Sequence, residues 1–465
     1  MRSLITALPL LALATPALAQ RAAPPPSPRV EPRVAASRDA ALKDEVAYDI
    51  VAGLTTEVGP RLAATEAEAR ARGWAVARLK ALGFRNVHVE PYHMPVWLRG
   101  EESAEVVSPF PQKLRLTALG NSGATPAAGL TLPIAYFASF ADLQAAPAGS
   151  LAGKIAFVSN AMMPTMDGSG YGMAGPARFV GASVAAQKGA AAIVIRSIGT
   201  DHGRGPHTGG TNFAQGVTPI PAAALSVADA ENLERMVKTG RPITLHLTLT
   251  PRTLPDGESG NVVAEVPGTD PAAGVVLIGG HLDSWDLGTG AIDDGAGVAI
   301  TTAAAKRFLD GPRPRRTIRV VWFGAEEPGG FGGRAYAEAH KADHYVFAAE
   351  SDLGADRVWR VQASVADANK PLFDRVAAAL APLGIVKGTG PAEGGTDVGP
   401  TLRTGVASIG LDQSALRYFD YHHTPEDTLD RIDPEQLRQN VAAWVTVLAT
   451  VADAPEAMGP VTPKK

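Results

Sequence analysis

The feature that most constrains the fold is a series of continuous apolar runs after residue 260, each followed by a loop and then a helical pattern. The runs are "VVLIGG", "IRVVWFG", "YVFAA" and "VASIGL". A run that is apolar throughout, rather than at every second position, indicates a strand buried on both faces. The repeated order of strand, loop and helix predicts an α/β fold with a mostly parallel sheet and helices on both faces.

Acidic and imidazole side chains follow these runs where the strands are expected to end. Ligands of open parallel sheets bind outside the carboxyl ends of the strands, so these side chains are expected to face one crevice. The residues are His281 and Asp283 after the first run, Asp293 in the loop that follows, Glu326 and Glu327 after the second run, Asp352 after the third, and His422 and His423 after the fourth.

Each of these motifs alone has an ordinary structural interpretation. Two glutamates after a strand are typical of a solvated helix start, two histidines of a surface, and two aspartates before a glycine of a turn or helix cap. Their placement at successive strand ends favours a metal site instead. The sequence has no cysteine, so any metal must be held by imidazoles and carboxylates.

The two ends of the chain predict segments outside the folded domains. Residues 1–19 combine a basic start, a short apolar core and small residues before a cleavage site, which predicts a secretory signal peptide. The apolar core is shorter than the roughly 20 residues that span a bilayer. We therefore expect a secreted or periplasmic protein without a membrane anchor after cleavage. Residues 20–38 are expected to be a disordered linker and residues 456–465 a flexible tail.

The amino-terminal part of the folded chain predicts two helices and a strand. The helices are expected over residues 39–59 and 65–84, with Asp39 and Thr65 as caps and Gly83 as a stop. The segment "NVHVEPYHMP" alternates between polar and apolar residues as a strand does.

Residues 121–251 differ in texture from the segments on either side. They contain short strand-like runs separated by a long loop rich in glycine, histidine and threonine, and they predict an inserted, strand-rich domain. The net charge of −4 disfavours a nucleic-acid partner.

Several motifs together resemble the co-catalytic zinc aminopeptidase and carboxypeptidase family. They are "GGHLDSWDLGTGAIDDGAG", "FGAEEPGG", "AESDLG", "EGGTD" and "YHHTPEDT", with "WLRGEES" upstream. The resemblance covers nearly the whole chain after the signal peptide, and the insertion at 121–251 resembles a protease-associated domain. It implies that residues 39–120 and 252–455 form one zinc peptidase catalytic domain.

The resemblance implies two zinc ions per chain that share Asp293 as a bridging ligand. One zinc would also bind His281 and Asp352, and the other Glu327 and His423. A shared carboxylate can hold two metals about 3.5 to 4 Å apart. The reaction implied is attack by a bridging hydroxide on the scissile carbonyl of a dipeptide or short peptide, polarised by zinc.

Four further residues receive expected roles. Glu326 would be the general base that passes a proton to the leaving amine. Asp283 lies two residues after His281 on the same side of an extended chain and would orient that imidazole. His422 stands where some relatives have a tyrosine that stabilises the oxyanion. Asp397 would either meet a free α-amino group or serve as a turn or helix-capping residue.

The long loop of the insertion, residues 199–216, is expected to border the substrate site and to limit the length of substrates without affecting zinc. Its two histidines, His202 and His207, lack acidic or cysteine partners at ligand spacing and are expected at the surface. The family resemblance also implies a possible homodimer.

Two other functions fit the same architecture. A non-catalytic binding ectodomain is disfavoured by the intact ligand set. A single-zinc enzyme similar to glutaminyl cyclase is disfavoured by the bridging set and the insertion. The sequence leaves open the side-chain preference and whether a free amino or a free carboxyl terminus is required.

Overall fold

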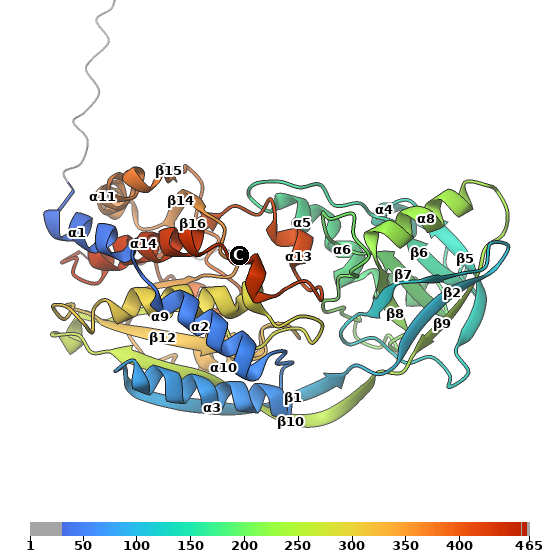
Figure 1. The fold of residues 1–465 in the computed structure, drawn as a ribbon, viewed down its shortest axis with the longest axis horizontal. Coiled ribbons are helices and arrows are strands. Elements are labelled where there is room, and N and C mark those ends of the chain that lie inside the picture. Colours follow the sequence, from blue (N-terminus) through green and yellow to red (C-terminus); the bar gives the residue numbers. More distant parts are fainter. Residues whose placement is uncertain (1–29, 457, 463–465) are drawn as a thin grey trace, which may run out of the picture.

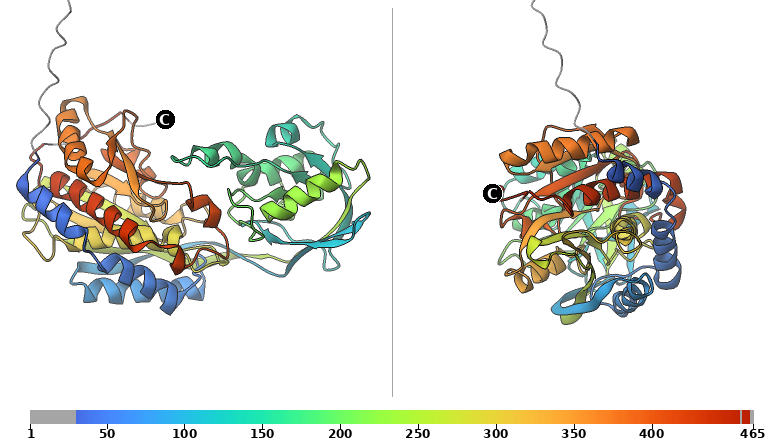
Figure 2. Two further views of the ribbon diagram at one scale, coloured as in Figure 1. Left: turned by 45° about the horizontal axis from the view of Figure 1, so that its top comes forward. Right: turned by 90° about the vertical axis from the view of Figure 1, so that its left-hand side faces the viewer.

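The computed structural model describes residues 30–456 and 458–462, and the predicted signal peptide lies outside them. The chain forms two lobes connected by a long antiparallel ribbon of β1 (Arg85–Leu98) and β10 (Arg252–Val266) (Figure 1). A turned view shows this ribbon running from the main lobe to the inserted lobe (Figure 2). We name the part built from residues before β1 and after β10 the main lobe, and the part between the two strands the inserted lobe.

The main lobe is built on a five-stranded sheet in the order β1-β10-β12-β11-β13. Its other strands are β11 (Val275–His281), β12 (Thr317–Phe323) and β13 (Tyr345–Glu350). β11 pairs in parallel with β12 and β13, whereas β10 is antiparallel to β1 and β12. The predicted α/β class is confirmed, and the sheet is mixed because the ribbon to the inserted lobe forms one edge.

Helices cover both faces of this sheet. The helices of the main lobe are α1 (Pro32–Ala41), α2 (Val46–Gly53), α3 (Glu66–Ala81), α9 (Ala296–Lys306), α10 (Phe331–Ala339), α11 (Lys370–Leu380), α12 (Gly399–Leu402), α13 (Tyr418–Tyr421) and α14 (Pro434–Val451). Short helical turns are η1 (Leu54–Val58), η2 (Pro271–Ala273), η3 (Ala291–Gly295), η4 (Asp367–Asn369), η5 (Ala381–Leu383) and η6 (Leu429–Arg431). Within the described part of the chain, no helix has the length and apolar character needed to cross a membrane.

The continuous apolar character of β11 follows from this double cover. Val276 and Ile278 belong to the large core that also contains side chains of α9 and α14. Leu277 points the other way, into a cluster with Tyr336 of α10. Alternate residues of a strand face opposite sides, so both sides of β11 must be apolar. The strand end at His281 is therefore held within a packed core.

The fourth apolar run predicted from the sequence lies in a separate three-stranded sheet. This sheet contains β14 (Val358–Ser364), β15 (Val386–Lys387) and β16 (Ser408–Gln413), with β16 antiparallel to β14. A single bridge between Phe347 and Ala407 connects it to β13. The run thus continues the main sheet at its edge without pairing along its length.

The amino-terminal helices differ from the prediction. The expected single helix over 39–59 is divided: α1 ends at Ala41 and α2 begins at Val46. Between them, the carboxylate of Asp44 accepts the N–H of Ala47 at 3.0 Å. Asp39 lies inside α1 and caps nothing. Helix α1 also occupies part of the predicted disordered linker, since it packs against α14 and buries Val34.

The second predicted helix is confirmed as α3. Its cap Thr65 accepts the N–H of Glu68 at 3.5 Å. Gly83, just after its end, has a φ of 92°, a left-handed conformation that favours glycine.

The inserted lobe contains an eight-stranded sheet in the order β3-β2-β9-β5-β6-β7-β8-β4. Its strands are β2 (Glu102–Ser108), β3 (Gln112–Leu114), β4 (Leu116–Ala118), β5 (Leu130–Phe137), β6 (Ile155–Val158), β7 (Ala192–Arg196), β8 (Ala222–Leu225) and β9 (Thr244–Leu249). Its helices are α4 (Phe140–Ala145), α5 (Ser169–Ala174), α6 (Pro176–Phe179), α7 (Gly181–Gln187) and α8 (Val227–Val237). The lobe begins before the predicted boundary at residue 121, because β2 pairs with β9 and β4 pairs with β8.

The predicted flexible tail is packed in its described residues. Met458 is fully buried, and its carbonyl accepts the N–H of Ala366 at 3.0 Å. The N–H of Val461 donates to the carbonyl of Gly405 at 2.9 Å. These backbone bonds fasten the segment to the main lobe.

Candidate metal centre

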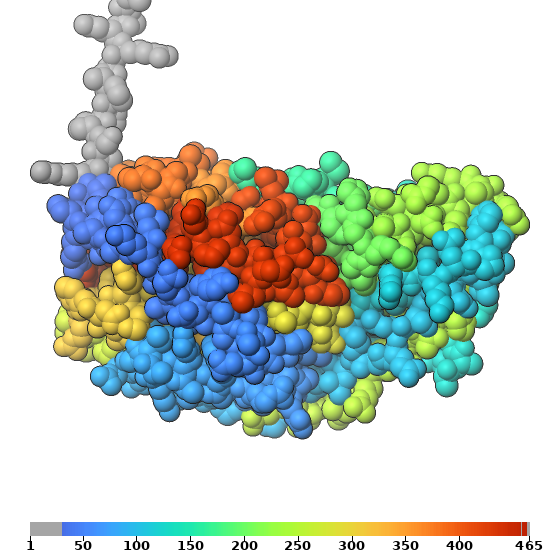
Figure 3. Space-filling model, viewed as in Figure 1, coloured from blue at the N-terminus to red at the C-terminus, as the bar shows by residue number. Residues whose placement is uncertain are grey.

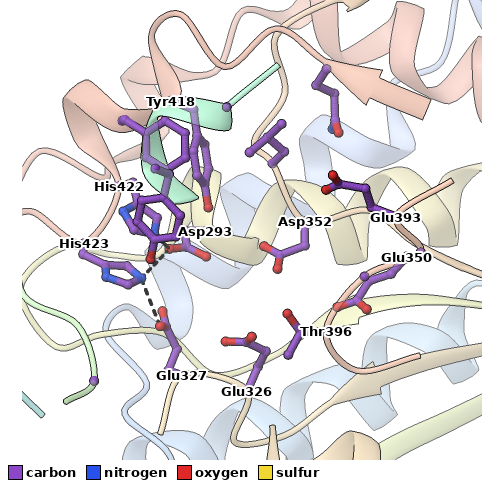
Figure 4. A pocket seen from close by; sticks show the side chains of 18 of the residues that line it. Asp293, Glu326, Glu327, Glu350, Asp352, Glu393, Thr396, Tyr418, His422 and His423 are labelled. Atoms are coloured by element: carbon purple, nitrogen blue, oxygen red, sulfur yellow. Dashed lines mark ion pairs between the residues drawn. The ribbon is translucent and has the colours of Figure 1, made fainter. Parts of the chain in front are cut away.

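A cavity of about 740 Å³ lies where the two lobes meet. Carboxylates and imidazoles that follow β11, β12, β13 and α13 line it from the main lobe. Tyr171, Arg178 and Asn212 line it from the inserted lobe. Figure 4 shows the acidic and imidazole side chains directed into the same space.

The first group of candidate ligands lies at the ends of two parallel strands. His281 ends β11, and its Nε2 lies 3.1 Å from Oδ1 of Asp293 and 3.6 Å from Oδ1 of Asp352. Asp352 follows β13, the parallel neighbour of β11. Parallel strands present their carboxyl ends at the same edge, which brings His281 and Asp352 together.

The second group lies beside the first and shares one residue with it. Nε2 of His423, which follows α13, lies 3.0 Å from Oε2 of Glu327 and 3.2 Å from Oδ2 of Asp293. Glu327 follows β12. Asp293 thus offers Oδ1 to one group and Oδ2 to the other, the arrangement expected of a bridging ligand.

These residues fit a pair of divalent metal ions. Oδ2 of Asp293 and Oε1 of Glu327 are buried and have no hydrogen-bond partner among the described residues. The ligand atoms of His281, Asp293 and Glu327 all lie within 4.8 Å of one another. Imidazole nitrogens and carboxylate oxygens in this density are ligands that zinc accepts.

Burial and mutual repulsion make these carboxylates hard to ionise together. Burial, with the nearby acids, raises the pKa of Glu326 well above its usual value against the opposing effect of His281. Burial also raises the pKa of Glu327 and of Asp352. Burial would raise the pKa of Asp293 as well, but the hydrogen bond to His281 and the ion pair with His423 hold it well below its usual value. Bound cations would stabilise the ionised form of all four acids.

Comparison with known proteins identifies the family. The model of peptidase family M28 matches residues 261–448. Carboxypeptidase Q from Bos taurus is 37% identical over 412 residues, covering 88% of this chain and 86% of that protein. The human carboxypeptidase Q is 36% identical over the same shares. The chain belongs to peptidase family M28. It is a metallopeptidase similar to carboxypeptidase Q, as the sequence motifs predict.

Solved structures agree with this family membership. The peptidase M28 precursor from Shewanella amazonensis has a TM-score of 0.90 and 48% identity, covering 93% of this chain and 98% of that one. A zinc aminopeptidase from Bacillus subtilis has a TM-score of 0.62 at 19% identity, covering 90% and 97%. The second likeness shows a shared fold, and the first extends through both lobes. This M28 peptidase therefore shares both of its lobes with a solved member of its family.

Asp283 contacts more than the imidazole that it was predicted to orient. Its backbone carbonyl lies 2.9 Å from Nδ1 of His281, and its Oδ1 lies 3.6 Å from the same nitrogen. Its carboxylate accepts the N–H of Glu326 at 3.0 Å and of Glu327 at 3.3 Å. Asp283 thus connects the end of β11 to the turn that carries both glutamates of this M28 peptidase.

His422 lies in the site but differs from its neighbour. Its ring stacks on His423 with centroids 3.5 Å apart, and its Nε2 lies 3.7 Å from Oδ2 of Asp293. Burial and the neighbouring His423 lower the pKa of His422 well below its usual value, so the ring is neutral. Its Nδ1 has no hydrogen-bond partner in the described chain.

Asp397 does not line the cavity. It is 1% exposed, and its Oδ1 accepts the N–H of Gly333 in the first turn of α10 at 3.1 Å. Asp397 therefore bonds to the backbone of α10 and does not cap α12, the helix that directly follows it. The same loop reaches the cavity through Glu393 and Thr396, beside Glu350 of β13 (Figure 4).

Several residues that support the site were missed by sequence reasoning. Asp294 accepts the N–H of His281 at 3.0 Å. Arg61 is fully buried and donates to the carbonyls of Thr289 at 2.7 Å and Gly290 at 2.8 Å. Asp427 accepts the N–H groups of residues 291 and 292 at 2.8 and 2.7 Å. The second acid of "DDG" and the acid of "PEDT" were visible in the motifs, whereas no pattern around Arg61 distinguished it.

The two histidines of the loop 199–216 have different environments. His202 is exposed, as predicted. The surface prediction for His207 is wrong, because its ring is buried between Asp201 and the backbone of His422. Asp201 precedes it by only six residues, a spacing that sequence reasoning did not weigh.

Proposed function

We propose that this M28 peptidase is a secreted or periplasmic di-zinc exopeptidase that hydrolyses dipeptides and short peptides. The observation that carries the proposal is the position of Asp293, whose two carboxylate oxygens face two different ligand groups. His281 and Asp352 would hold one ion, and Glu327 and His423 the other. Zinc ions bound there would supply an activated water at neutral pH and polarise the scissile carbonyl.

Glu326 is the proton carrier in this proposal. It lines the cavity beside Glu327, and its own backbone is fixed by the carboxylate of Asp283. With zinc bound, its carboxylate would take a proton from the attacking water and then return it to the leaving amine. Burial, which raises the pKa of Glu326, makes this carboxylate a stronger proton acceptor. The lowered pKa of His422 favours its neutral form, in which one ring nitrogen carries a proton. His422 lines the cavity, and this N–H would donate a hydrogen bond to the oxyanion.

The proposed substrate length follows from the walls of the cavity. A volume of about 740 Å³ accommodates a small ligand. The inserted lobe closes the side that faces the metal ligands, with Gly210 and Asn212 of the loop 199–216 in the lining. A protein chain passing through the site would have to displace this wall, so exopeptidase action on short substrates is favoured.

The proposal is tested by metal analysis and a dipeptide-library assay on the same purified sample. We expect two zinc ions per chain, hydrolysis of dipeptides, and loss of activity with a chelator that zinc restores. One ion in a fully active protein would instead support the single-zinc alternative. Absence of both metal and hydrolysis would support a binding ectodomain.

A further inference from the structure

The loop 199–216 of the inserted lobe is hydrogen-bonded to the segment that carries a candidate metal ligand. The N–H of Thr208 donates to the carbonyl of His423 at 3.0 Å. In return, Nδ1 of His423 lies 3.3 Å from the carbonyl of Thr208. Nδ1 of His207 lies 2.8 Å from the carbonyl of His422. Figure 3 shows the carboxyl-terminal part of the main lobe, in red, in direct contact with the inserted lobe, in green.

The direction of these bonds fits a metal ligand. Nε2 of His423 faces Asp293 and Glu327, so Nδ1 must carry the proton when Nε2 binds a metal. The carbonyl of Thr208 lies 3.3 Å from Nδ1 and is the acceptor for that proton. Nη1 of Arg178 lies 3.2 Å from the same Nδ1 and 3.4 Å from the carbonyl of Thr208. Because a guanidinium only donates, Arg178 must bond to the carbonyl, and not to Nδ1, when Nδ1 carries the proton. Partners of this kind orient a ligating imidazole and raise its basicity.

The backbone of His423 also needs external support. Its φ is 63°, a left-handed conformation that costs free energy for a residue with a side chain. Such a conformation persists only where surrounding contacts hold it. The bonds from Thr208 and His207 to the carbonyls of residues 423 and 422 are contacts of that kind.

His207 is itself held firmly. It is 1% exposed, and its backbone N–H donates to Oγ of Ser197 at 2.8 Å. On the ring, Nε2 lies 2.8 Å from Oδ1 of Asp201. A Cβ on Gly199 would lie 2.3 Å from the His207 ring, so only glycine leaves room for it. Burial would raise the pKa of Asp201, but the hydrogen bond and charge of His207 lower it below its usual value.

We propose that His207, fixed by Asp201, is a positioning residue through which the inserted lobe completes the second metal site. It holds the backbone of residues 422 and 423 so that Nε2 of His423 faces Glu327 and Asp293. The inference rests on the proposed di-zinc function. It goes beyond it by assigning part of the metal centre to a lobe that supplies no ligand.

The first metal site provides an internal reference. Nδ1 of His281 lies 2.9 Å from the carbonyl of Asp283, on the same stretch of chain. No residue of the inserted lobe takes part in that bond. Loss of the His207 contacts should therefore weaken one metal site and leave the other unchanged.

The test measures zinc dissociation constants of the full chain by competition with a chromogenic chelator. The variants are His207→Gln and Asp201→Asn, with His202→Gln, an exposed histidine of the same loop, as the matched control. We expect one of the two constants to rise by about 10-fold to 100-fold in both test variants. That constant should be the one that His423→Gln abolishes, and the control should match the wild type.

The outcomes separate this inference from the proposed function. If the wild type binds fewer than two zinc ions, the di-zinc proposal fails first. If the wild type binds two ions and both test variants keep both constants, the positioning role is refuted. If His207→Gln does not fold, the zinc constants of Asp201→Asn decide whether the inference stands. The melting temperature of its metal-free form, compared with the wild type, checks that this variant is folded. Weakening of both constants to the same extent would indicate a general structural role and would also overturn the inference.

Discussion

The two ligand groups of the candidate metal centre, its two halves, are built in different ways. His281 and Asp352 follow neighbouring parallel strands of one packed sheet, and the backbone partner of His281 is two residues away. His423 follows a four-residue helix, adopts a left-handed backbone conformation, and is supported by Thr208 of the other lobe. The first half is a product of the sheet, and the second depends on contact between lobes.

This difference teaches that a candidate metal ligand and the residues that hold it in place need not come from the same domain. A strand end inside a core is positioned by packing alone, since packed interiors leave few alternative arrangements. A ligand on a short helix has no such restraint and needs hydrogen bonds from elsewhere. The inserted lobe supplies those bonds and also forms a wall of the cavity.

The largest effect should come from removing the residue that both halves share. Asp293→Asn keeps the size of the side chain but removes the charge that faces both ligand groups. We expect zinc affinity to fall at both sites by at least about 100-fold. Mutation of residues that only hydrogen-bond to a metal ligand already lowers metal affinity by about 10-fold to 100-fold. Metal analysis after dialysis checks this. Retention of two ions would mean that Asp293 does not bridge.

A change at Glu326 should leave both halves intact while stopping turnover. Glu326→Gln removes the proton acceptor, so kcat should fall by about 10²-fold to 10⁴-fold. Both zinc ions should remain, because Glu326 belongs to neither ligand group. Glu327→Gln is the matched control and should lose one ion. If Glu326→Gln loses metal and Glu327→Gln does not, the two roles are reversed.

Shortening the loop 199–216 to a few glycines distinguishes the two halves. The sequence predicts a change in substrate length alone, with zinc content unaffected. Because the structure places Thr208 and His207 against the His423 segment, we instead expect the second zinc to weaken by about 10-fold to 100-fold as well. Zinc titration and peptides of increasing length measure both effects. Wild-type zinc binding would restore the simpler view of the loop as a wall.

The smallest effect should come from crowding His207 without removing it. Gly199→Ala places a methyl group 2.3 Å from its ring, so the ring must shift. We expect the second zinc to weaken by only a few-fold, roughly the lower end of the range for such partners. Gly205→Ala is the control, since its nearest neighbour would lie at 3.8 Å. Equal zinc binding in the two variants would show that the His207 ring can shift without changing the second zinc site.

Some features of the fold followed local rules and others did not. Thr65 and Gly83 mark the start and the end of α3 as predicted, because helix capping depends on residues within one turn. Helix α1 was mistaken for linker because its stability comes from packing against α14, far along the chain. The start of the inserted lobe was placed too late for a similar reason. Strands β2 and β4 are defined by partners more than 100 residues away.

The sequence by itself determined the metal-binding chemistry of this protein. A chain without cysteine that ends its buried strands in histidine and acid offers a crevice of candidate metal ligands, because the carboxyl ends of parallel strands lie at the same edge of a sheet. Only the tertiary structure decided what surrounds those ligands. Arg61 donates to the carbonyls of residues 289 and 290, and Asp397 accepts a backbone N–H of α10. His207 is buried against the backbone carbonyl of His422. These contacts join segments distant in sequence, and no local pattern specifies which buried polar group will find which partner.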